Sequence, residues 1–408
     1  MGAARGVRRG LTLALATIVA CAQPATAPTA ISTATDAQST RPVAPTPAPT
    51  PSPTPSPRIG PAVVENVQLI ASGLEAPWSV ALAPDGRLFV TERPGRVRIV
   101  RLGAGGGLEA KPWATLPARA NPDAERGLLG IALDPDFART GFVYLYYSYA
   151  APGGATLNRL VRMRDTNGSG TGETILLDNI PGSSNHDGGR IAFGPDGKLY
   201  VATGDGEQQA RAQDRASLGG KILRLEKDGS VPTDNPFPGS PVFSLGHRNV
   251  QGLAFEPDSG VLYATEHGPS GFFPACCQDE VNRIEAGANY GWPIVTGKPG
   301  DQRFRDPIAW SGNFDTWAPS GAAFATRPGP LRGSFLFATL RGQHLHRIVF
   351  TPDGRGVAFE ERLLVDQYGR LRDVYEISTG EFLVLTSNRD GRGRPAADDD
   401  RILLVTLR

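Results

Sequence analysis

The chain has 408 residues, with 42 Lys and Arg against 41 Asp and Glu, so its net charge is close to zero. Such a balance produces no overall field that would attract nucleic acid or an acidic membrane surface, and neither is expected as a direct partner. The 50 glycines and 36 prolines indicate many turns and few long helices, and three cysteines are too few for a disulfide scaffold.

The N-terminal segment has the pattern of an export signal. Arg5, Arg8 and Arg9 precede the apolar run LTLALATIVA, which is too short to span a bilayer. The stretch IVAC resembles a bacterial lipobox, which predicts a signal peptide over residues 1–21 and a lipid anchor on Cys21. A plain signal peptide cleaved nearby is the alternative.

The next segment, residues 22–61, is rich in Ala, Thr, Pro and Ser. It has too little apolar surface to form a core, and its prolines favour an extended chain. We therefore expect a disordered tether between the lipid and a folded domain at 62–408. The protein is expected to be exported, extracytoplasmic and attached to the cell membrane only through the lipid.

Residues 62–408 contain a repeated unit of two strands joined by a tight turn. In each copy, apolar residues are interrupted by the Gly, Pro or Asp residues that a tight hairpin requires. The domain allows about 58 residues for each of six copies, enough for a four-stranded blade, which predicts an all-β six-bladed β-propeller. A pair of β-sandwiches would not explain six similar hairpins. The copies begin at Ser79, Leu129, Arg190, Gly252, Ala322 and Asp373.

Short polar motifs stand directly before or after these hairpins. His186 immediately precedes the third copy, in the stretch SNHDGGRIAF. In a propeller the loops at one end of the central channel converge, so these motifs are expected to meet in one site. The other motifs are AERGLLG (124–130), GHRNVQG (246–252), TEHGP (265–269), ATLRG (338–342) and YGRLRD (368–373).

The motifs contribute one histidine and several arginines to this end of the channel. Arginine is suited to planar, bidentate recognition of carboxylate or phosphate groups. The set therefore predicts a polyanionic ligand beside a general base. The alternative is that each arginine pairs with a carboxylate of the blades. The residues are His186, Arg248, Arg341, Arg370 and Arg372.

The stretch from residue 265 to 293 is the other dense group of polar residues. Asp279 and Glu280, with Tyr290 nearby, offer hard oxygen ligands of the kind that calcium prefers, although no EF-hand loop is present. The adjacent Cys276 and Cys277 form either a vicinal disulfide, which export favours, or two buried thiols. The sequence contains no HExxH, CxxC, P-loop or GxSxG motif.

As an ordered set, the motifs resemble those of a known family, the soluble aldose sugar dehydrogenases that depend on pyrroloquinoline quinone (PQQ), also called glucose/sorbosone dehydrogenases. The resemblance extends from about Gly73 to the C-terminus and implies a six-bladed propeller. The motifs that carry it are GLLGIALDPDF, NHDGGRIAFGPDGKLYVATGD, LGGKILRLEKDGSVPTDNPF, GHRNVQGLAFEP, EHGP, DEVNRIEAGANYGWP and WAPSG.

The resemblance implies a role for each matching residue. His186 matches the base that takes the proton of the anomeric hydroxyl while C1 passes a hydride to the quinone. Gly268 and Pro269 match positions whose backbone carbonyls bind the catalytic calcium. Matches to a second, structural calcium site are Asp279, Glu280 and Tyr290, and matches to cofactor contacts are Arg248, Asn249, Thr316, Arg341, Arg370 and Arg372.

Several positions depart from the family pattern. Glu125 replaces a glutamine at the position that faces the sugar, and Asn185 replaces the aspartate before the base. Ser387 replaces an aspartate near the cofactor, and His267 replaces a glutamine. The loss of two carboxylates predicts fewer acceptors to orient the base and the arginines, and it leaves the preferred sugar open.

We therefore expect PQQ- and calcium-dependent oxidation of aldose sugars at C1 to lactones, with an external electron acceptor. The sequence permits a monomer or a homodimer. One alternative is a surface propeller that binds sugars or anions without catalysis. Another is a calcium-dependent lactonase, for which Glu125, Asn185 and Asn249 would supply part of the metal site.

Overall fold

The computed structural model describes residues 59–103, 105–269 and 276–408. The predicted signal peptide, Cys21 and almost all of the predicted tether lie outside the described residues. Within the described ranges, no helix is long and apolar enough to cross a membrane.

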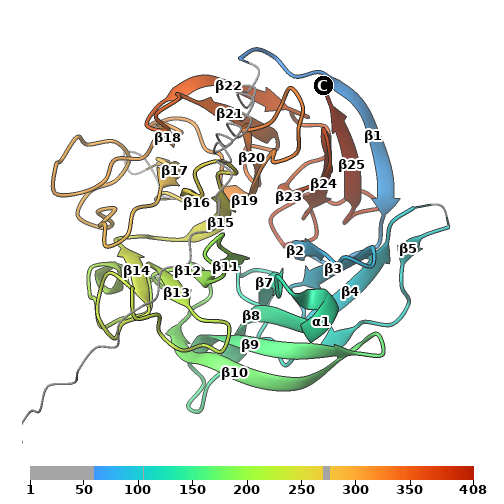
Figure 1. Ribbon diagram of the computed structural model, residues 1–408, viewed down its shortest axis with the longest axis horizontal. Coiled ribbons are helices and arrows are strands. Elements are labelled where there is room, and N and C mark those ends of the chain that lie inside the picture. The colour runs from blue at the N-terminus through green and yellow to red at the C-terminus, as the bar shows by residue number, and fades with distance from the viewer. Residues whose placement is uncertain (1–58, 104, 270–275) are drawn as a thin grey trace, which may run out of the picture. The chain divides into compact units, whose positions relative to one another are not determined.

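The described residues form six antiparallel sheets around a central axis (Figure 1). Each sheet is one blade, and neighbouring blades contact each other through their inner strands. The all-β six-bladed propeller expected from the repeats is confirmed. From the inner strand outwards, the first blade is β2 (Pro77–Leu82), β3 (Arg87–Glu92), β4 (Arg96–Arg101) and β5 (Gly107–Leu108), with β6 (Ala114–Thr115) also paired with β4, and the second blade is β7 (Leu128–Leu133), β8 (Phe142–Ala150), β9 (Thr156–Thr166) and β10 (Ser169–Pro181). The third blade is β11 (Gly188–Phe193), β12 (Leu199–Thr203), β13 (Lys221–Leu225) and β14 (Val242–Leu245), and the fourth is β15 (Val250–Phe255), β16 (Leu262–Glu266), β17 (Glu280–Arg283) and β18 (Ala309–Trp310). The fifth blade is β19 (Pro319–Phe324), β20 (Phe335–Thr339), β21 (Leu345–Phe350) and β22 (Val357–Leu363), and the sixth is β23 (Leu371–Ser378), β24 (Glu381–Thr386), β25 (Ile402–Leu407) and β1 (Val64–Ala71).

The sixth blade is built from both ends of the domain. Strand β1, drawn in blue, lies beside the dark red β25 (Figure 1), and Val67 is paired with Val405. The first strand of the domain thus occupies the outer position of the last sheet. This closure joins the first and last blades and covers the edge of β25, which would otherwise expose unpaired backbone groups.

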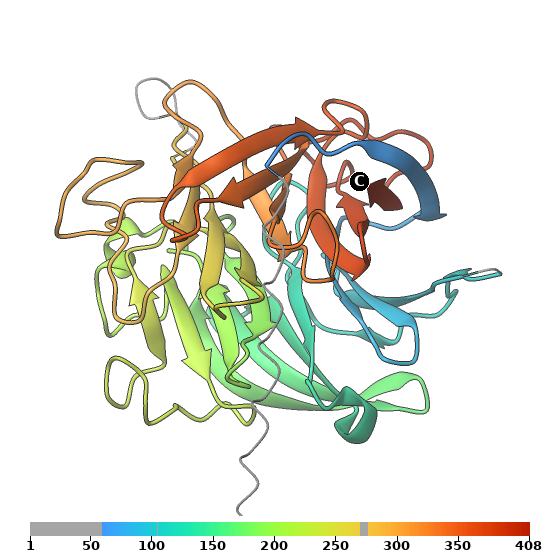
Figure 2. The ribbon, with the colours of Figure 1, turned by 45° about the horizontal axis from the view of Figure 1, so that its top comes forward.

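The core is divided among the six interfaces between blades, each of which contains one hydrophobic cluster of described residues. Between the first and second blades, for example, Phe89 and Val97 pack against Leu145 and Val161. Burial of each such side chain contributes about 1.5–3 kcal/mol. The second blade, drawn in green in Figure 2, has the longest strands, with 9, 11 and 13 residues in β8, β9 and β10.

An arginine crosses the central channel and ties several inner strands together. Arg190 of β11 donates through Nε to the carbonyl of Gln251 on β15 at 2.9 Å. Its Nη1 donates to Ser79 Oγ on β2 at 2.7 Å and to Asp373 Oδ2 on β23 at 2.9 Å. The guanidinium lies 4.4 Å from the ring of Trp78. This buried group therefore fixes four blades relative to one another.

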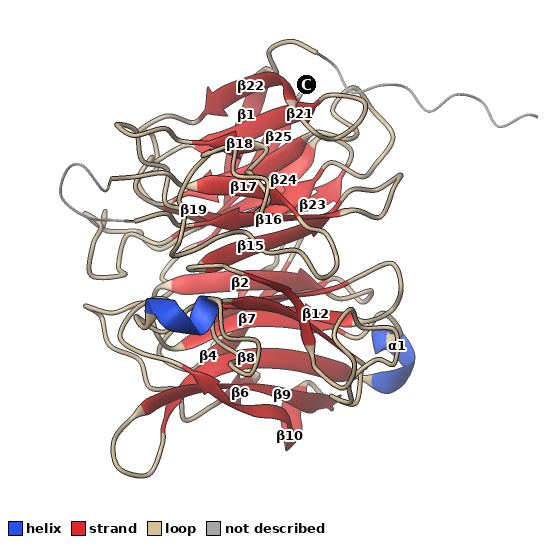
Figure 3. Ribbon diagram, turned by 90° about the vertical axis from the view of Figure 1, so that its left-hand side faces the viewer, coloured by secondary structure: helices blue, strands red, loops and turns tan. Residues whose placement is uncertain are grey.

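The two ends of the channel differ in character. At the end where the inner strands finish, a cavity of about 530 Å³ is lined largely by apolar residues of all six inner strands. At the opposite end, the polar motifs singled out in the sequence stand at the starts of the inner strands or just after the second strands. The two short helices mark these ends, with α1 (Phe137–Thr140) at one face and the 3₁₀ turn Gln209–Ala212 at the other (Figure 3).

Candidate active site

The predicted base, His186, is oriented by a buried carboxylate. Its Nδ1 lies 2.9 Å from Asp205 Oδ1, and its side chain is 19% exposed, whereas that of Asp205 is fully buried. The other oxygen of Asp205 accepts from Trp292 Nε1 at 2.8 Å. Because a carboxylate only accepts hydrogen bonds, it keeps the imidazole proton on Nδ1 and leaves Nε2 free to accept a proton.

The backbone at His186 lies in the left-handed region, with φ of 59°. This conformation is unfavourable for a residue with a side chain and persists only where the surroundings hold it. The His186 N–H donates to Glu125 Oε2 at 3.1 Å, and its carbonyl accepts from Gly206 N at 3.1 Å. The direction of the base is thus set by its backbone as well as by Asp205.

Asp205 was not among the predicted site residues, although it ends the quoted motif RIAFGPDGKLYVATGD. Strands β11 and β12 pair Gly188 with Thr203, and continuing this register by two residues places position 186 opposite position 205. This register depends on a bulge between Gly188 and Ile191, because the pairs nearer the turn, such as Ile191 with Val201, would place position 187 opposite position 205. The position of the turn in the sequence therefore did not give the His186–Asp205 contact. The predicted shortage of acceptors for the base does not occur, because Asp205 supplies one.

Glu125 connects three parts of the site. Its Oε2 accepts from His186 N and from Asn249 Nδ2 at 3.0 Å, and its Oε1 accepts from Arg392 Nη1 at 2.8 Å. Burial alone would raise the pKa of Glu125, but the electrostatic effects of His267, Arg392 and His186 lower it below its ordinary value. Burial lowers the pKa of His267 to about 3, so at neutral pH the cation that keeps Glu125 ionised is chiefly Arg392.

Asn185, predicted with Glu125 to contact substrate, lies at the same rim. Its Oδ1 accepts from Arg392 Nη2 at 2.6 Å, and its Nδ2 donates to Glu207 Oε1 at 3.1 Å. The structure thus brings Glu125 and Asn185 together through Arg392, which lies in the loop between β24 and β25. Both oxygens of Glu125 already accept hydrogen bonds, and nothing in this arrangement favours the metal site of a lactonase.

Arg248 and Asn249 precede β15 and point towards the same end of the channel. Arg248 is 8% exposed, and burial lowers its pKa. Its Nη1 donates to the carbonyl of His267 at 3.2 Å, and its guanidinium lies 5.4 Å from the Trp292 ring. Asn249 Oδ1 accepts from Gly188 N at 3.1 Å. The predicted pair is therefore held next to the loop that carries the base.

The two arginines of the YGRLRD motif share one carboxylate. Arg370 donates through Nε to Asp390 Oδ2 at 2.9 Å, whereas Arg372 Nη2 lies 3.8 Å from the same oxygen. Burial lowers the pKa of Arg372 to about 9, and its Nε has no hydrogen-bond partner among the described residues. Ser387 replaces a family aspartate, so a carboxylate acceptor for these arginines was expected to be missing. Asp390 supplies such an acceptor. One buried and one partly buried guanidinium group with a single carboxylate retain capacity for an anionic ligand.

The remaining cofactor positions lie on the fifth blade. Arg341 is exposed, and its N–H donates to the carbonyl of Trp317 at 3.2 Å. Thr316 Oγ1 donates to Asp279 Oδ2 at 3.3 Å. These two residues are adjacent to the channel end, but the structure does not bring the Arg341 side chain into the buried arginine set.

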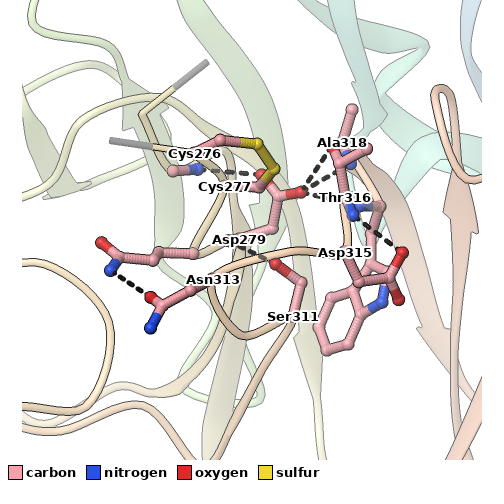
Figure 4. The surroundings of a disulfide bond; sticks show 11 residues. Cys276, Cys277, Asp279, Ser311, Asn313, Asp315, Thr316 and Ala318 are labelled. Carbon is pink, nitrogen blue, oxygen red and sulfur yellow. Dashed lines mark hydrogen bonds between the residues drawn. A yellow bond between two sulfur atoms is a disulfide. The ribbon is translucent and has the colours of Figure 1, made fainter. Parts of the chain in front are cut away.

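Asp279 holds two loops together rather than presenting free oxygens. Its Oδ1 accepts from Gly268 N at 3.0 Å, and its Oδ2 accepts from Trp317 N at 2.7 Å and Ala318 N at 2.9 Å (Figure 4). Cys276 and Cys277, which are separated from Asp279 by one residue, are joined by a disulfide (Figure 4), the alternative that export had favoured over two buried thiols. This disulfide lies in the segment that packs against Gly268.

Four of the five predicted calcium residues line one small cavity of about 10 Å³, namely Gly268, Pro269, Glu280 and Tyr290. Glu280 accepts from Gly297 N at 3.0 Å, and burial and nearby Glu266 raise its pKa. The Tyr290 hydroxyl donates to the Arg283 carbonyl at 2.6 Å. Within the described ranges, no group of three or more His, Cys, Asp or Glu side chains is placed to hold a metal ion, so both calcium sites stay predictions.

Comparison with known proteins defines the family. The model of the glucose/sorbosone dehydrogenase family matches residues 74–403. The chain belongs to this family. Its members include sugar dehydrogenases, so the resemblance seen in the motifs is confirmed over nearly the whole propeller.

Individual members of the glucose/sorbosone dehydrogenase family are similar over most of their length. The chain is 32% identical to aldose sugar dehydrogenase YliI of Escherichia coli, over 81% of this chain and 92% of that protein. It is 34% identical to quinoprotein glucose dehydrogenase B of Acinetobacter calcoaceticus, over 58% of this chain and 54% of that protein. The chain is 40% identical to the aldose sugar dehydrogenase of Streptomyces coelicolor, whose structure was solved with PQQ bound. The two structures match with a TM-score of 0.75, over 87% of this chain and 100% of that chain.

Proposed function

We propose that the protein oxidises aldose sugars at C1 to lactones with PQQ as its cofactor. The observation that carries this proposal is the oriented His186–Asp205 pair beside buried Arg248 and Arg372 and the partly buried Arg370. Membership of the glucose/sorbosone dehydrogenase family and similarity to a PQQ-bound relative support it.

The donors at the site fit a tricarboxylated quinone. Arg370 and Arg372 would hold carboxylates of the cofactor, because they share a single protein carboxylate and Arg372 Nε is buried without a partner in the described structure. Asn249, Thr316 and Arg341 are the further cofactor contacts that the family motifs suggest. When bound, PQQ supplies an o-quinone that accepts the hydride leaving the sugar C1.

The chain's own residues perform the proton transfer. His186 Nε2 accepts the proton of the anomeric hydroxyl, while Asp205 keeps the imidazole in the required tautomer and stabilises its positive charge. Arg248 is buried and directed into the site, where a guanidinium stabilises negative charge that develops in the transition state. The electrons then leave to an external acceptor.

Calcium forms a further part of the proposal. The carbonyls of Gly268 and Pro269 would contribute to a catalytic site, and Asp279, Glu280 and Tyr290 would contribute to a structural one. The shared cavity lined by Gly268, Pro269, Glu280 and Tyr290 supports such binding, since calcium takes carbonyl and carboxylate oxygens. The oxygens of Asp279 already accept backbone hydrogen bonds, so Asp279 would have to give up some of these bonds to bind calcium.

The test uses the purified full chain with added PQQ and calcium. Reduction of an artificial dye is measured across a panel of aldoses, with the protein lacking PQQ as the control. His186→Ala is expected to lower kcat by about 10²–10⁴-fold while PQQ binding, followed by absorbance, is retained. Unchanged turnover in this variant, or no PQQ-dependent dye reduction with any sugar, would contradict the proposal.

A further inference from the structure

Two arginines at the rim of the active site, Arg126 and Arg392, have no role in the reaction described above. Arg392 lies in the loop between β24 and β25, and Arg126 lies in the segment before β7. Both reach the residues that precede the base, because Arg392 Nη2 donates to Asn185 Oδ1 at 2.6 Å and Arg126 Nη1 donates to Ser184 Oγ at 3.4 Å. Two guanidinium groups from different blades thus flank the entrance to His186.

These two arginines retain hydrogen-bonding capacity. The Arg392 side chain is 41% exposed, and its two hydrogen bonds to Glu125 and Asn185 leave further N–H groups at the rim. Arg126 donates to the hydroxyls of Thr156 and Ser184, and it forms no ion pair with any acidic residue that the structure describes. Its Nε is buried without a partner among those residues. The rim therefore presents cationic donors that are only partly used.

The polar groups expected to face the sugar are, in contrast, already engaged. Both oxygens of Glu125 accept hydrogen bonds, and both ends of the Asn185 amide are occupied by Arg392 and Glu207. Glu207 also accepts from Ser183 Oγ. The part of the substrate remote from C1 consequently meets donors in excess of acceptors.

A carboxylate matches this excess of donors better than hydroxyl groups do. Each sugar hydroxyl is both a donor and an acceptor, whereas an ionised carboxylate only accepts and pairs with guanidinium groups in a bidentate manner. Near the entrance, the cations Arg126 and Arg392 face the carboxylates of Glu125 and Glu207, and buried Arg93 and Asp205 offset each other. Arg392 is paired with Glu125, whereas Arg126 has no ion pair among the described residues, so a substrate carboxylate would supply its missing partner.

We propose that Arg126 and Arg392 bind the carboxylate of an anionic aldose, a uronic acid, while its C1 hydroxyl lies at His186. This inference rests on the proposed sugar oxidation and makes the two arginines specificity-determining residues. The carboxylate of the substrate takes no part in the oxidation, so the reaction needs no additional reactant. Neutral aldoses remain substrates, but poorer ones.

The first test compares kcat and KM for glucuronate and galacturonate with those for glucose and galactose, using the full chain loaded with PQQ and calcium. A uronate is expected to exceed its neutral counterpart by about tenfold or more in kcat/KM, since a hydrogen bond to a charged group is worth such a factor. Arg126→Gln and Arg392→Gln are expected to remove this preference mainly by raising the KM for the uronate. Arg392→Lys should retain part of it.

Arg394→Gln is the matched control, because Arg394 is an exposed arginine of the same loop that makes neither of the Arg392 hydrogen bonds. It is expected to leave the ratio of uronate to neutral kcat/KM unchanged. If Arg392→Gln lowered the activity towards neutral and acidic sugars equally, the residue would be structural and the inference would be wrong. A wild-type protein that prefers neutral sugars would overturn it as well.

A second readout measures binding without turnover. Isothermal titration of glucuronate, and separately of PQQ, is carried out on the wild type and on Arg392→Gln. A weaker glucuronate Kd with an unchanged PQQ Kd supports the inference, whereas a weaker PQQ Kd alone would assign Arg392 to the cofactor and overturn it. Failure of every sugar to reduce the dye would count against the proposed oxidation, and the glucuronate titration would still decide the role of the arginines.

Discussion

His186 Nδ1 and Asp205 Oδ1 are 2.9 Å apart, and the two residues lie at opposite sides of the same β-hairpin. The carboxylate is completely buried and also accepts from Trp292. The hairpin that carries the base therefore also carries the group that orients it.

Asp205→Asn tests this relationship. The amide removes the negative charge and permits the wrong imidazole tautomer, so kcat is expected to fall by about 10²–10⁴-fold. PQQ binding should change little, since the Asp205 side chain hydrogen-bonds His186 and Trp292 and makes no hydrogen bond to the side chains of Arg248, Arg370 or Arg372. Trp292→Phe, which removes the other hydrogen bond to Asp205, is expected to have a smaller effect. Equal kcat in Asp205→Asn and wild type would contradict this role.

Asp187→Asn tests a buried carboxyl next to the base. Asp187 is 1% exposed, its Oδ2 has no partner in the described part of the chain, and burial raises its pKa to about 8. The folded protein thus holds a proton that the unfolded chain releases near pH 4. The contribution of Asp187 to the free energy of unfolding is therefore fully present below pH 4 and is lost as the pH rises to about 8. Between these values, the free energy of unfolding falls by up to about 1.4 kcal/mol per pH unit.

The free energy of unfolding of wild type and Asp187→Asn is measured in urea from pH 4 to pH 9. The amide does not titrate, so the difference between the two proteins should shift in favour of the variant as the pH rises. The exposed Asp123→Asn serves as the control and should follow wild type. Parallel pH profiles for wild type and Asp187→Asn would show that Asp187 is ionised in the folded protein.

Arg190→Met tests the ion pair that crosses the channel. Arg190 and Asp373 are both buried and 2.9 Å apart, and burial raises the pKa of Asp373. Removing the cation leaves a buried carboxylate without its charge partner, which is expected to lower the free energy of unfolding by about 3–5 kcal/mol. Arg139→Met breaks the exposed pair with Asp136 and should cost less than about 1 kcal/mol. Similar losses in both variants would refute a special role for Arg190.

Cys21→Ser tests the lipid anchor in a bacterial host. With Cys21 as the lipidated residue, wild type should fractionate with membranes and incorporate labelled palmitate. The serine variant should lose the label and leave the membrane fraction. Dye reduction by the serine variant should equal that of wild type, because the strands of the described blades begin at Val64. Palmitate label on the serine variant would place the modification elsewhere.

The six repeated hairpins are visible in the sequence alone, and they were sufficient to predict the propeller fold. Hairpins with turn residues at similar positions need partners for their apolar faces, and a closed ring of six provides them. The site residues at the ends of these hairpins could be predicted because blade topology brings equivalent loops together. His186, Arg248, Asn249, Arg370 and Arg372 are all found at that end of the channel.

The partners of those residues depend on the tertiary structure. Asp205 lies opposite His186 only because a bulge shifts the register of β11 and β12, and Asp390 and Arg392 come from a long loop whose path no local pattern specifies. Arg392 crosses from the sixth blade to Glu125 and Asn185 before the second and third blades, and this contact changes which groups are free to meet a substrate.

The sequence by itself thus determined the propeller and the family, and it predicted the base and the arginines of the site. Periodicity and motif order are local properties of the chain, and they are sufficient for these conclusions. Only the tertiary structure decided which carboxylates orient the base and the arginines, and which donors remain free at the rim. Those features arise from contacts between blades, where separation along the chain is large and side-chain direction is set by packing.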